Sequence, residues 1–260
     1  MHPAAFPEPS RTSAALRITV VIPARWDSTR FPGKALADLN GAPMIAHVHR
    51  SALRVRGVDQ VIVATDDARI ADAVRGFGGT PMLTARSHCT GTDRVAEVAR
   101  ALDCDVIVNV QGDEPTIAPE MIAEVLVPFA DAAVRMTTLR RRLERDEDYT
   151  SPHVVKVVVD QSDDALYFSR APIPARRGHD AAVYKHIGLY AYRREFLLTL
   201  AALPQTPLER AESLEQLRVL EHGFRIRTPE TTYDSIGVDT PEDLERVRRQ
   251  LQELTAAARV

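Results

Sequence analysis

The sequence has few cysteines, few lysines and no long uncharged stretch, and each shortage excludes a class of protein. Two cysteines, Cys89 and Cys104, can form neither a disulfide framework nor a four-ligand zinc site, so we expect two free thiols in a reducing compartment. The longest stretch without Asp, Glu, Lys or Arg is residues 196–208, thirteen residues, whereas a membrane-spanning helix needs about 20. Residues 1–17 have no apolar segment after a basic start, so we expect a disordered leader and no secretory signal. These absences exclude an integral membrane protein and a disulfide-rich secreted one.

Charge excludes a further class. The formal net charge is −3, which does not favour a general nucleic-acid binder. Among 33 basic residues only Lys34, Lys156 and Lys185 are lysines, and the other thirty are arginines. Arginine is a planar fork and lysine a compact point charge, so we expect lysine where a point charge is needed. The alternative, that any single one of the three survives by chance, stays open.

The first half of the 260-residue chain alternates strand and helix signals. Apolar runs of strand length lie at 18–22, 61–64 and 106–110, and helix-period segments lie at 44–54, 68–75 and 92–102. The third helical segment opens with a capping-box pattern from Thr90 to Asp93. Continuous apolar strands separated by helices predict a doubly wound α/β fold with a mostly parallel sheet, whose ligands lie beyond the carboxyl ends of the strands. We interpret residues 18–260 as one domain, with 18–150 as its first, more regular half.

The second half is less regular, and we expect a smaller mixed part over residues 151–240. Strands are predicted at 154–159, 165–168 and 187–192. Thr206 followed by Pro207 is typical of a helix start, and that helix is predicted to run to about residue 221. Thr240 and Pro241 repeat the pattern and predict a C-terminal helix over 241–260. The charge run at 140–148 is self-neutralising and is expected to be a solvated surface.

A basic loop follows the first predicted strand, at residues 23–34. Its cations Arg25, Arg30 and Lys34 would meet at the carboxyl edge of the sheet, which suits a polyphosphate. It is not a Walker loop, which would need glycine at position 28 and serine or threonine at position 35. The nearest dinucleotide fingerprint, at 76–81, ends in proline and lies between a helix and a strand. A merely basic turn is the alternative interpretation of the loop.

Two acidic residues from distant segments favour a shared metal. Asp113 follows the strand predicted at 106–110, and Asp239 directly precedes Thr240, which already fills the N-cap position. Mg²⁺ in proteins is commonly held by one or two carboxylates together with phosphate and water. The alternative for Asp113 is that it caps the following helix.

Ten segments, in order over residues 18–251, resemble the 3-deoxy-manno-octulosonate cytidylyltransferases, the CMP-Kdo synthetases. They are IPARWDSTRFPGK, PMIAHV, VATDD, HCTGTDRVAEV, VNVQGDEP, VVKVVVD, ALYFSRAPIP, KHIGLYAYR, LEQLRVLEHG and GVDTPEDLERV. The resemblance implies a nucleotide-diphospho-sugar-transferase-like fold, in which residues 18–150 form the nucleotide-binding half and residues 151–240 the sugar-binding and dimerisation part. The leader lies outside it.

The resemblance also implies a role for individual residues. The positions that grip the CTP triphosphate and support catalysis are Arg25, Arg30 and Lys34. Those that read cytosine and ribose are Pro23, Ala24, Thr65, Asp66, Arg94 and Gln111. Those that bind Mg²⁺ are Asp113 and Asp239. Those that hold the acidic sugar are Arg170, His186, Tyr190, Glu215 and Gln216.

The chemistry of the sugar-binding set is reasonable. Arg170 and His186 can oppose a sugar carboxylate, and Tyr190 offers a partner for hydroxyls. Glu215 and Gln216 offer further hydroxyl partners, and their i,i+3 and i,i+4 spacing from Glu212 predicts that all three share one helix face.

The implied reaction transfers CMP from CTP to the 2-hydroxyl of 3-deoxy-D-manno-octulosonate (Kdo), giving CMP-Kdo and pyrophosphate with Mg²⁺. The resemblance further implies a homodimer and a cytoplasmic role that supplies lipopolysaccharide synthesis. Two alternatives stay open. One is a cytidylyltransferase for another 2-keto acid sugar, 8-amino-Kdo or sialic acid. The other is a non-catalytic nucleotide-sugar-binding protein, which would be expected to lose a metal acid or the loop lysine, whereas Asp113, Asp239 and Lys34 are all present.

Overall fold

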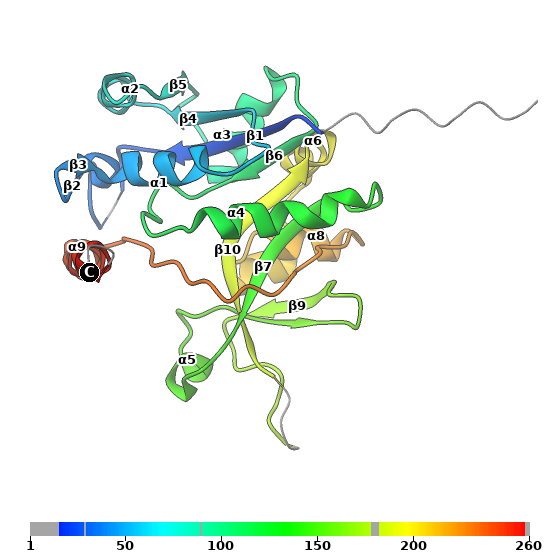
Figure 1. The fold of residues 1–260 in the computed structure, drawn as a ribbon. Coiled ribbons are helices and arrows are strands. Elements are labelled where there is room, and N and C mark those ends of the chain that lie inside the picture. Colours follow the sequence, from blue (N-terminus) through cyan, green and yellow to red (C-terminus); the bar gives the residue numbers. More distant parts are fainter. Residues whose placement is uncertain (1–15, 29, 89, 178–181, 258–260) are drawn as a thin grey trace, which may run out of the picture.

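An eight-stranded sheet forms the centre of the molecule (Figure 1). The computed structural model describes residues 16–28, 30–88, 90–177 and 182–257. Seven of the eight strands follow the order β5-β4-β1-β6-β10-β8-β9, and β7 pairs with β10. The parallel strands are β1 (Ile18–Ala24), β4 (Gln60–Thr65), β5 (Thr80–Leu83) and β6 (Val106–Asn109). The antiparallel strands are β7 (Met136–Arg142), β8 (Lys156–Val159), β9 (Ala165–Ser169) and β10 (Tyr184–Arg193).

Helices cover both faces of the sheet. Apolar residues of α1 (Met44–Leu53), α2 (Ala68–Gly76) and α4 (Pro119–Leu126) pack on one face. Those of α3 (Gly91–Arg100), α6 (Arg194–Ala202) and α8 (Leu217–Glu221) pack on the other. Along β1, Val20 and Ile22 belong to the first core and Val21 to the second. The doubly wound α/β prediction is confirmed.

The chain order creates a switch point between β1 and β6. From β1 the chain continues to β4 and β5 on one side, and then returns to β6 on the other side of β1. Ligands of doubly wound sheets bind where the strand order reverses in this way. The capping box predicted at the start of α3 is present, with Thr90 and Asp93 bonded reciprocally. The fold therefore directs attention to the loops after β1 and β6.

The helix predicted from Pro207 to about residue 221 is wrong, because the chain forms two helices there. Helix α7 (Pro207–Glu212) ends at Ser213, which has a left-handed φ of 52°. The Glu212 carboxylate accepts hydrogen bonds from Ser169 Oγ at 2.6 Å and from Arg170 N at 2.9 Å. These bonds tie the end of α7 to the end of β9. Consequently Glu212 does not share one helix face with the residues that precede α8.

The charge run at 140–148 is not a uniformly solvated surface. Arg140 is only 6% exposed, on β7, and its guanidinium donates to Thr228 O and to Asp163 Oδ1. The sequence pattern missed β7 because its second half is a run of arginines. A short helix, α5 (Asp146–Thr150), takes up the acidic end of the run.

Residues 16 and 17, which were predicted to belong to the leader, are part of the fold. Leu16 packs against the core, and Arg17 forms ion pairs with Asp103 and Asp105. Residues 1–15 of the leader lie outside the described residues. Of the two cysteines, Cys104 is a buried free thiol and Cys89 lies outside the described residues.

The C-terminal helix α9 (Pro241–Ala257) returns to the first half of the chain. Leu244 and Val247 of α9 pack on Met44 and on Leu39 of the hairpin formed by β2 (Asp38–Leu39) and β3 (Ala42–Pro43). The predicted helix start at Thr240 is confirmed, because Asp243 N donates to its hydroxyl at 3.2 Å. None of the helices in the described part of the chain is both long and apolar enough to cross a bilayer.

Candidate active site

A cavity of about 310 Å³ opens at the carboxyl ends of β1 and β6, at the switch point. It is lined by the loop after β1, the start of α3, the loop after β6 and Asp239, two residues before α9 begins. The lining residues are Pro23, Ala24, Arg25, Ser28, Arg30, Lys34, Ala35, Met44, His88, Thr90, Gly91, Arg94, Gln111, Gly112, Asp113 and Asp239.

Trp26 and Gly33 shape the basic loop. The Trp26 carbonyl accepts hydrogen bonds from Ser28 N and Gly33 N, both at 2.9 Å. Gly33 has a φ of 71°, and a Cβ there would lie 2.9 Å from the Trp26 indole. Any other residue would therefore be strained and would collide with the ring. On the outer side, the Arg69 guanidinium lies 3.4 Å from the centre of the indole. The loop is thus folded back so that Lys34 opens the short 3₁₀ helix η1 (Lys34–Leu36) inside the cavity.

Gly112 allows the two loops to approach each other. A Cβ at this position would lie 2.7 Å from the carbonyl oxygen of Pro23. The loop after β6 can therefore pass against the end of β1 only with glycine. This contact brings Gln111 and Asp113 to the same cavity as the basic loop.

The two predicted metal acids meet at Lys34. Lys34 Nζ lies 2.7 Å from Asp113 Oδ2 and 3.1 Å from Asp239 Oδ1, and it also donates to Val238 O at 2.9 Å. Arg30 Nη2 lies 2.8 Å from Asp239 Oδ2. The lysine that we expected to face phosphate thus joins the two acids. The alternative role of Asp113 as a helix cap is wrong, since α4 begins at Pro119 with Ala118 as its N-cap residue.

This donor set fits Mg²⁺. Two carboxylates that are far apart in the sequence, Asp113 and Asp239, converge on the ammonium group of Lys34. Within the described ranges, no group of three or more His, Cys, Asp or Glu side chains could hold a metal alone. A divalent cation at Asp113 and Asp239 would therefore complete its shell with phosphate oxygens and water, as Mg²⁺ does in phosphoryl-transfer sites.

The remaining cavity wall suits an anion. Arg25 is exposed on the loop and lines the cavity. Thr90 and Gly91 contribute the N-terminus of the ten-residue helix α3, where backbone N–H groups and the helix dipole favour negative charge.

Only some of the residues predicted to read the base line the cavity. Arg94 is 3% exposed and lines the cavity, and its guanidinium donates to Asp66 Oδ2 at 2.7 Å and to Thr84 Oγ1. Asp66 and Thr65 do not line the cavity, and Asp66 is connected to it through its ion pair with Arg94. Gln111 lines the cavity, and its side-chain amide donates to Asn109 Oδ1 at 3.3 Å.

The sequence analysis missed His88. It lines the cavity and is paired with Glu97 of α3, whose pKa is lowered by hydrogen bonds from the Ala85 amide and from His88. The signal was available, since His88 opens one of the quoted family segments, but no role had been given to it.

A second cavity, of about 160 Å³, adjoins the first. The two share Gly91 and Gln111. The residues that line the second cavity are Gly91, Thr92, Gln111, Met136, Tyr190, Tyr192, Leu200, Glu215 and Gln216. Three of the five predicted sugar-binding residues are therefore brought together, by β10 and by the break before α8.

The second cavity holds polar groups with unmet bonding capacity. The Gln216 amide nitrogen is buried without a hydrogen-bond partner among the described residues, and the residue is only 4% exposed. Burial raises the pKa of Glu215. A buried donor without a partner costs free energy, so such a group points to a ligand.

Arg170 and His186 lie outside both cavities. The Arg170 guanidinium donates to backbone carbonyls, Nε to Glu212 O at 2.9 Å and Nη1 to Pro152 O at 3.0 Å. His186 Nε2 lies 2.9 Å from Thr138 Oγ1, and the ring packs between Phe168 and Tyr190. Burial lowers the pKa of His186 to about 3, so the ring is neutral at physiological pH. It would meet a carboxylate as a hydrogen-bonding group and not as a cation.

Glu114 is a second residue to which the sequence analysis gave no role. Burial and the neighbouring charge of Asp113 raise its pKa to about 7. A Cβ on Gly188 of β10 would lie 3.6 Å from Glu114 Oε1, so this carboxyl group faces the strand that carries Tyr190.

Comparisons with known proteins agree with this geometry. The cytidylyltransferase family model matches residues 19–227. A 3-deoxy-manno-octulosonate cytidylyltransferase of Geobacter metallireducens is 56% identical over 249 residues, 91% of this chain and 98% of that protein. The protein of the same name from Geobacter sulfurreducens is 55% identical over 250 residues, 91% of this chain and all of that protein.

Solved structures extend the comparison. A CMP:2-keto-3-deoxy-manno-octonic acid synthetase complexed with CTP superposes with a TM-score of 0.88 at 45% identity, covering 91% of this chain and 99% of that one. The 4-diphosphocytidyl-2C-methyl-D-erythritol synthase of Anaerococcus prevotii is 15% identical with a TM-score of 0.62, over 92% of this chain and all of that one, and shares the fold alone. The chain belongs to the cytidylyltransferase family, among the 3-deoxy-manno-octulosonate cytidylyltransferases.

Proposed function

We propose that the protein transfers CMP from CTP to the 2-hydroxyl of Kdo, releasing pyrophosphate, in a reaction that requires Mg²⁺. The observation that carries the proposal is the junction of the two cavities at Gly91 and Gln111. A basic cavity suited to a triphosphate adjoins a neutral polar cavity suited to a sugar. Nucleotidyl transfer needs the attacking hydroxyl and the α-phosphorus held in contact, and adjoining sites provide this.

The basic cavity binds and activates the triphosphate. Arg25, Arg30 and Lys34 neutralise the charge that builds on the departing pyrophosphate, as fixed cations do in phosphoryl-transfer sites. Asp113 and Asp239 hold Mg²⁺. Lys34 contacts both of these acids, so its ammonium group lies beside the phosphates that the metal binds. When bound, the metal draws charge from the phosphate oxygens. In this scheme no side chain is a nucleophile.

The base is selected by Arg94 and Gln111. Arg94 is held by Asp66, so its free N–H groups can donate to the acceptors of cytosine. A site built for the 4-amino donor of cytosine leaves a polar group unpaired with uracil, so we expect CTP to be preferred over UTP.

Tyr190, Glu215 and Gln216 bind the hydroxyls of the sugar. The buried amide nitrogen of Gln216 gains the acceptor that it lacks within the described residues when a hydroxyl occupies the second cavity. Arg170 and His186 remain predicted sugar ligands. Either would first have to exchange the contacts described above for contacts with the substrate.

We also propose that the protein works as a homodimer in the cytoplasm and supplies lipopolysaccharide synthesis. The support is the family to which the chain belongs. Light scattering on the purified protein tests the dimer, which requires a mass near twice the chain mass of 28.8 kDa.

Pyrophosphate release, assayed across nucleotides and acid sugars, tests the reaction. We expect turnover with CTP and Kdo that disappears in EDTA, and weak or no turnover with UTP. Faster turnover with sialic acid or 8-amino-Kdo would replace the sugar in the proposal. Trp26, the single tryptophan, lies in the basic loop, so its fluorescence reports CTP binding without turnover. A fluorescence change with CTP, together with no pyrophosphate from any sugar, would support the non-catalytic alternative.

A further inference from the structure

Asp239 is carried by an extended segment, residues 231–239, which we call the strap. The strap has no helix or strand of its own and leads to α9 (Figure 1). At its beginning, Thr231 N donates to Arg140 O of β7 at 2.8 Å. Such a segment has few bonds to hold it, so its position depends on the contacts of particular side chains.

The end of the strap is docked on the loop that carries Asp113. Ile236 N donates to Thr116 Oγ1 at 2.8 Å, and Val238 N donates to Asp113 O at 2.8 Å. The backbone of the strap thus fixes the distance between the two acids. Any slip of the strap would move Asp239 relative to Asp113.

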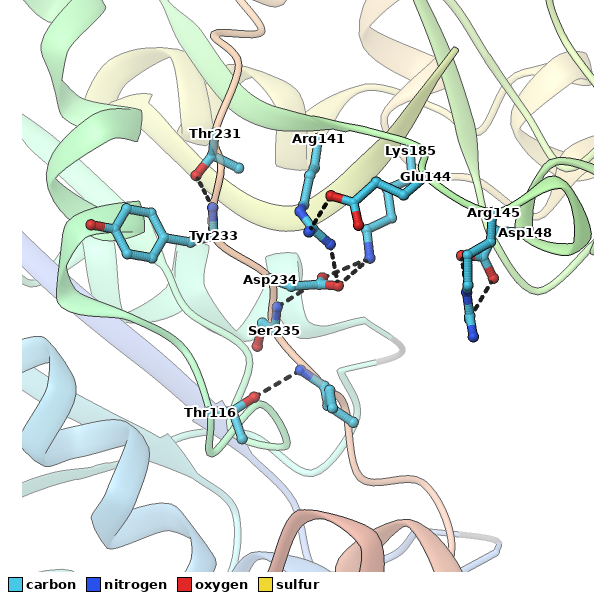
Figure 2. Close-up of polar contacts among 11 residues, drawn as sticks. Thr116, Arg141, Glu144, Arg145, Asp148, Lys185, Thr231, Tyr233, Asp234 and Ser235 are labelled. Carbon is cyan, nitrogen blue, oxygen red and sulfur yellow. Dashed lines mark hydrogen bonds and ion pairs between the residues drawn. The ribbon is translucent and has the colours of Figure 1, made fainter. Parts of the chain in front are cut away.

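Asp234 fastens the middle of the strap, as Figure 2 shows. Its carboxylate accepts from Lys185 Nζ at 2.6 and 2.7 Å, and from Arg141 Nη1 at 2.7 Å. Lys185 belongs to β10 and Arg141 to β7. The strap is therefore tied to two strands of the sheet through a single carboxylate.

The pairing of β7 with β10 places two cations opposite each other, and the Asp234 carboxylate offsets their repulsion. Lys185 and Arg141 are direct cross-strand partners. Like charges in this relation repel each other, and the anion between them turns repulsion into attraction. The Lys185 and Arg141 side chains are 19% and 21% exposed, so water screens them incompletely. Glu144 contacts the other end of the Arg141 guanidinium, at 2.9 Å, and leaves Lys185 to Asp234.

We propose that Asp234 is a positioning residue: clamped by Lys185 and Arg141, it holds the strap in the register that places Asp239 opposite Asp113. It lines neither cavity. The inference rests on the proposed function, because it assigns a purpose to the position of Asp239. It also gives a role to Arg141, which belongs to the charge run at 140–148, and to Lys185, which is one of the three lysines.

A neighbouring ion pair offers a matched control. Arg145 and Asp148 form a two-bond pair at 3.0 and 3.2 Å in the same part of the molecule, also drawn in Figure 2. This pair lies on and beside α5 and, among the described residues, forms no hydrogen bond or ion pair with the strap, although the charge of Asp234 acts on Arg145 from a distance. The variant Asp148→Asn removes one carboxylate charge there, as Asp234→Asn does on the strap.

The experiment compares Asp234→Asn, Asp234→Glu, Asp148→Asn and Asp239→Asn in the full-length protein. Steady-state kinetics with CTP and Kdo are measured together with amide hydrogen exchange at Ile236 and Val238. For Asp234→Asn we expect kcat to fall about tenfold with KM for Kdo unchanged, and the two amides to exchange at least about tenfold faster. Asp234→Glu keeps the charge and should restore at least half of kcat, and Asp148→Asn should change neither measurement.

Three outcomes overturn the inference. Faster exchange with unchanged kcat means that the clamp serves stability only. Unchanged exchange means that Asp234 does not hold the strap. Equal losses in Asp234→Asn and Asp148→Asn mean a general effect of charge. If Asp239→Asn is itself fully active, the proposed metal role fails, whereas an inactive Asp239→Asn beside a fully active Asp234→Asn overturns the positioning role alone.

Discussion

The two adjoining cavities differ in the residues that line them and in the elements that carry these residues. The larger is lined by cations and two acids, most of them on loops that follow parallel strands and one, Asp239, just before α9. The smaller is lined by tyrosines, an amide and a buried carboxyl group, on an antiparallel strand and a break between two helices. Charged residues that directly follow a strand can be recognised from a local sequence motif. The role of neutral groups depends on packing contacts between residues that are far apart in the sequence, so a local motif does not predict it.

The largest effect is expected from the acids of the charged cavity. Asp113→Asn and Asp239→Asn should each lower kcat by at least ~10²-fold, corresponding to about 2.7 kcal/mol of transition-state stabilisation. Both residues lie outside helices and strands, so the fold should survive. Kinetics at saturating Mg²⁺ measure the loss. Asp72→Asn, which changes an exposed carboxylate paired with Arg75 on α2, is the control and should keep full activity.

Lys34 tests whether the charged cavity needs a point charge or any positive charge. Its Nζ contacts Asp113, Asp239 and Val238 O, and the side chain is 14% exposed. A guanidinium is wider and cannot take the place of an ammonium among three converging acceptors. Lys34→Arg should therefore lower kcat nearly as much as Lys34→Ala, by about tenfold or more. A Lys34→Arg variant with more than about half of the wild-type kcat would reduce Lys34 to a generic cation.

The same contrast explains what could be predicted. Strands β1, β4 and β6, the basic loop and Asp113 follow from short apolar runs and from charges at strand ends, and Asp239 follows from its place before the helix start at Thr240 and Pro241. Strand β7 was missed because Arg140 hides a buried position among surface-like residues. The break at Ser213 was missed because Glu212 satisfies β9 instead of continuing a helix, and that contact spans more than forty residues.

Of the other two lysines, only Lys156 supports the reasoning from composition, and the partners of neither could be predicted. Lys156 is fully buried and donates to the carbonyl oxygens of Ser151, Val154 and Arg170 at 2.6–2.8 Å. Lys185 holds the strap through Asp234. The Lys156 ammonium serves three separate carbonyl acceptors, which a planar fork could not do in the same space, whereas the two oxygens of Asp234 are a pair that arginine could also bind.

Gln216 tests the neutral cavity, where we expect a smaller effect. Gln216→Met removes a buried donor that lacks a partner among the described residues and keeps the volume of the side chain. We expect KM for Kdo to rise about tenfold, since a lost hydrogen bond to substrate is worth roughly 1 kcal/mol or more. The thermal midpoint of the free protein should stay the same or rise, because an unpaired polar group is gone. A fall in the midpoint with unchanged KM would assign Gln216 to the core.

The smallest effect concerns His186, behind the neutral cavity, and pH. The folded-state pKa is lowered by burial to about 3, against 6.5 in the unfolded chain. Between these values the unfolded chain binds the proton more readily, so stability falls as pH falls below 6.5 and is unaffected above it. From pH 7 to 5.5 this one group should lower the free energy of unfolding by about 1 kcal/mol.

The variant His186→Gln tests this. It keeps a donor toward Thr138 but does not titrate, so urea unfolding at the two pH values should show that loss in the wild type and a correspondingly smaller one in the variant. His153→Gln, at an exposed position, controls for the removal of one histidine. Equal pH dependence in wild type and His186→Gln would mean that the ring can protonate in place, and His186 would then be free to meet the sugar carboxylate as a cation.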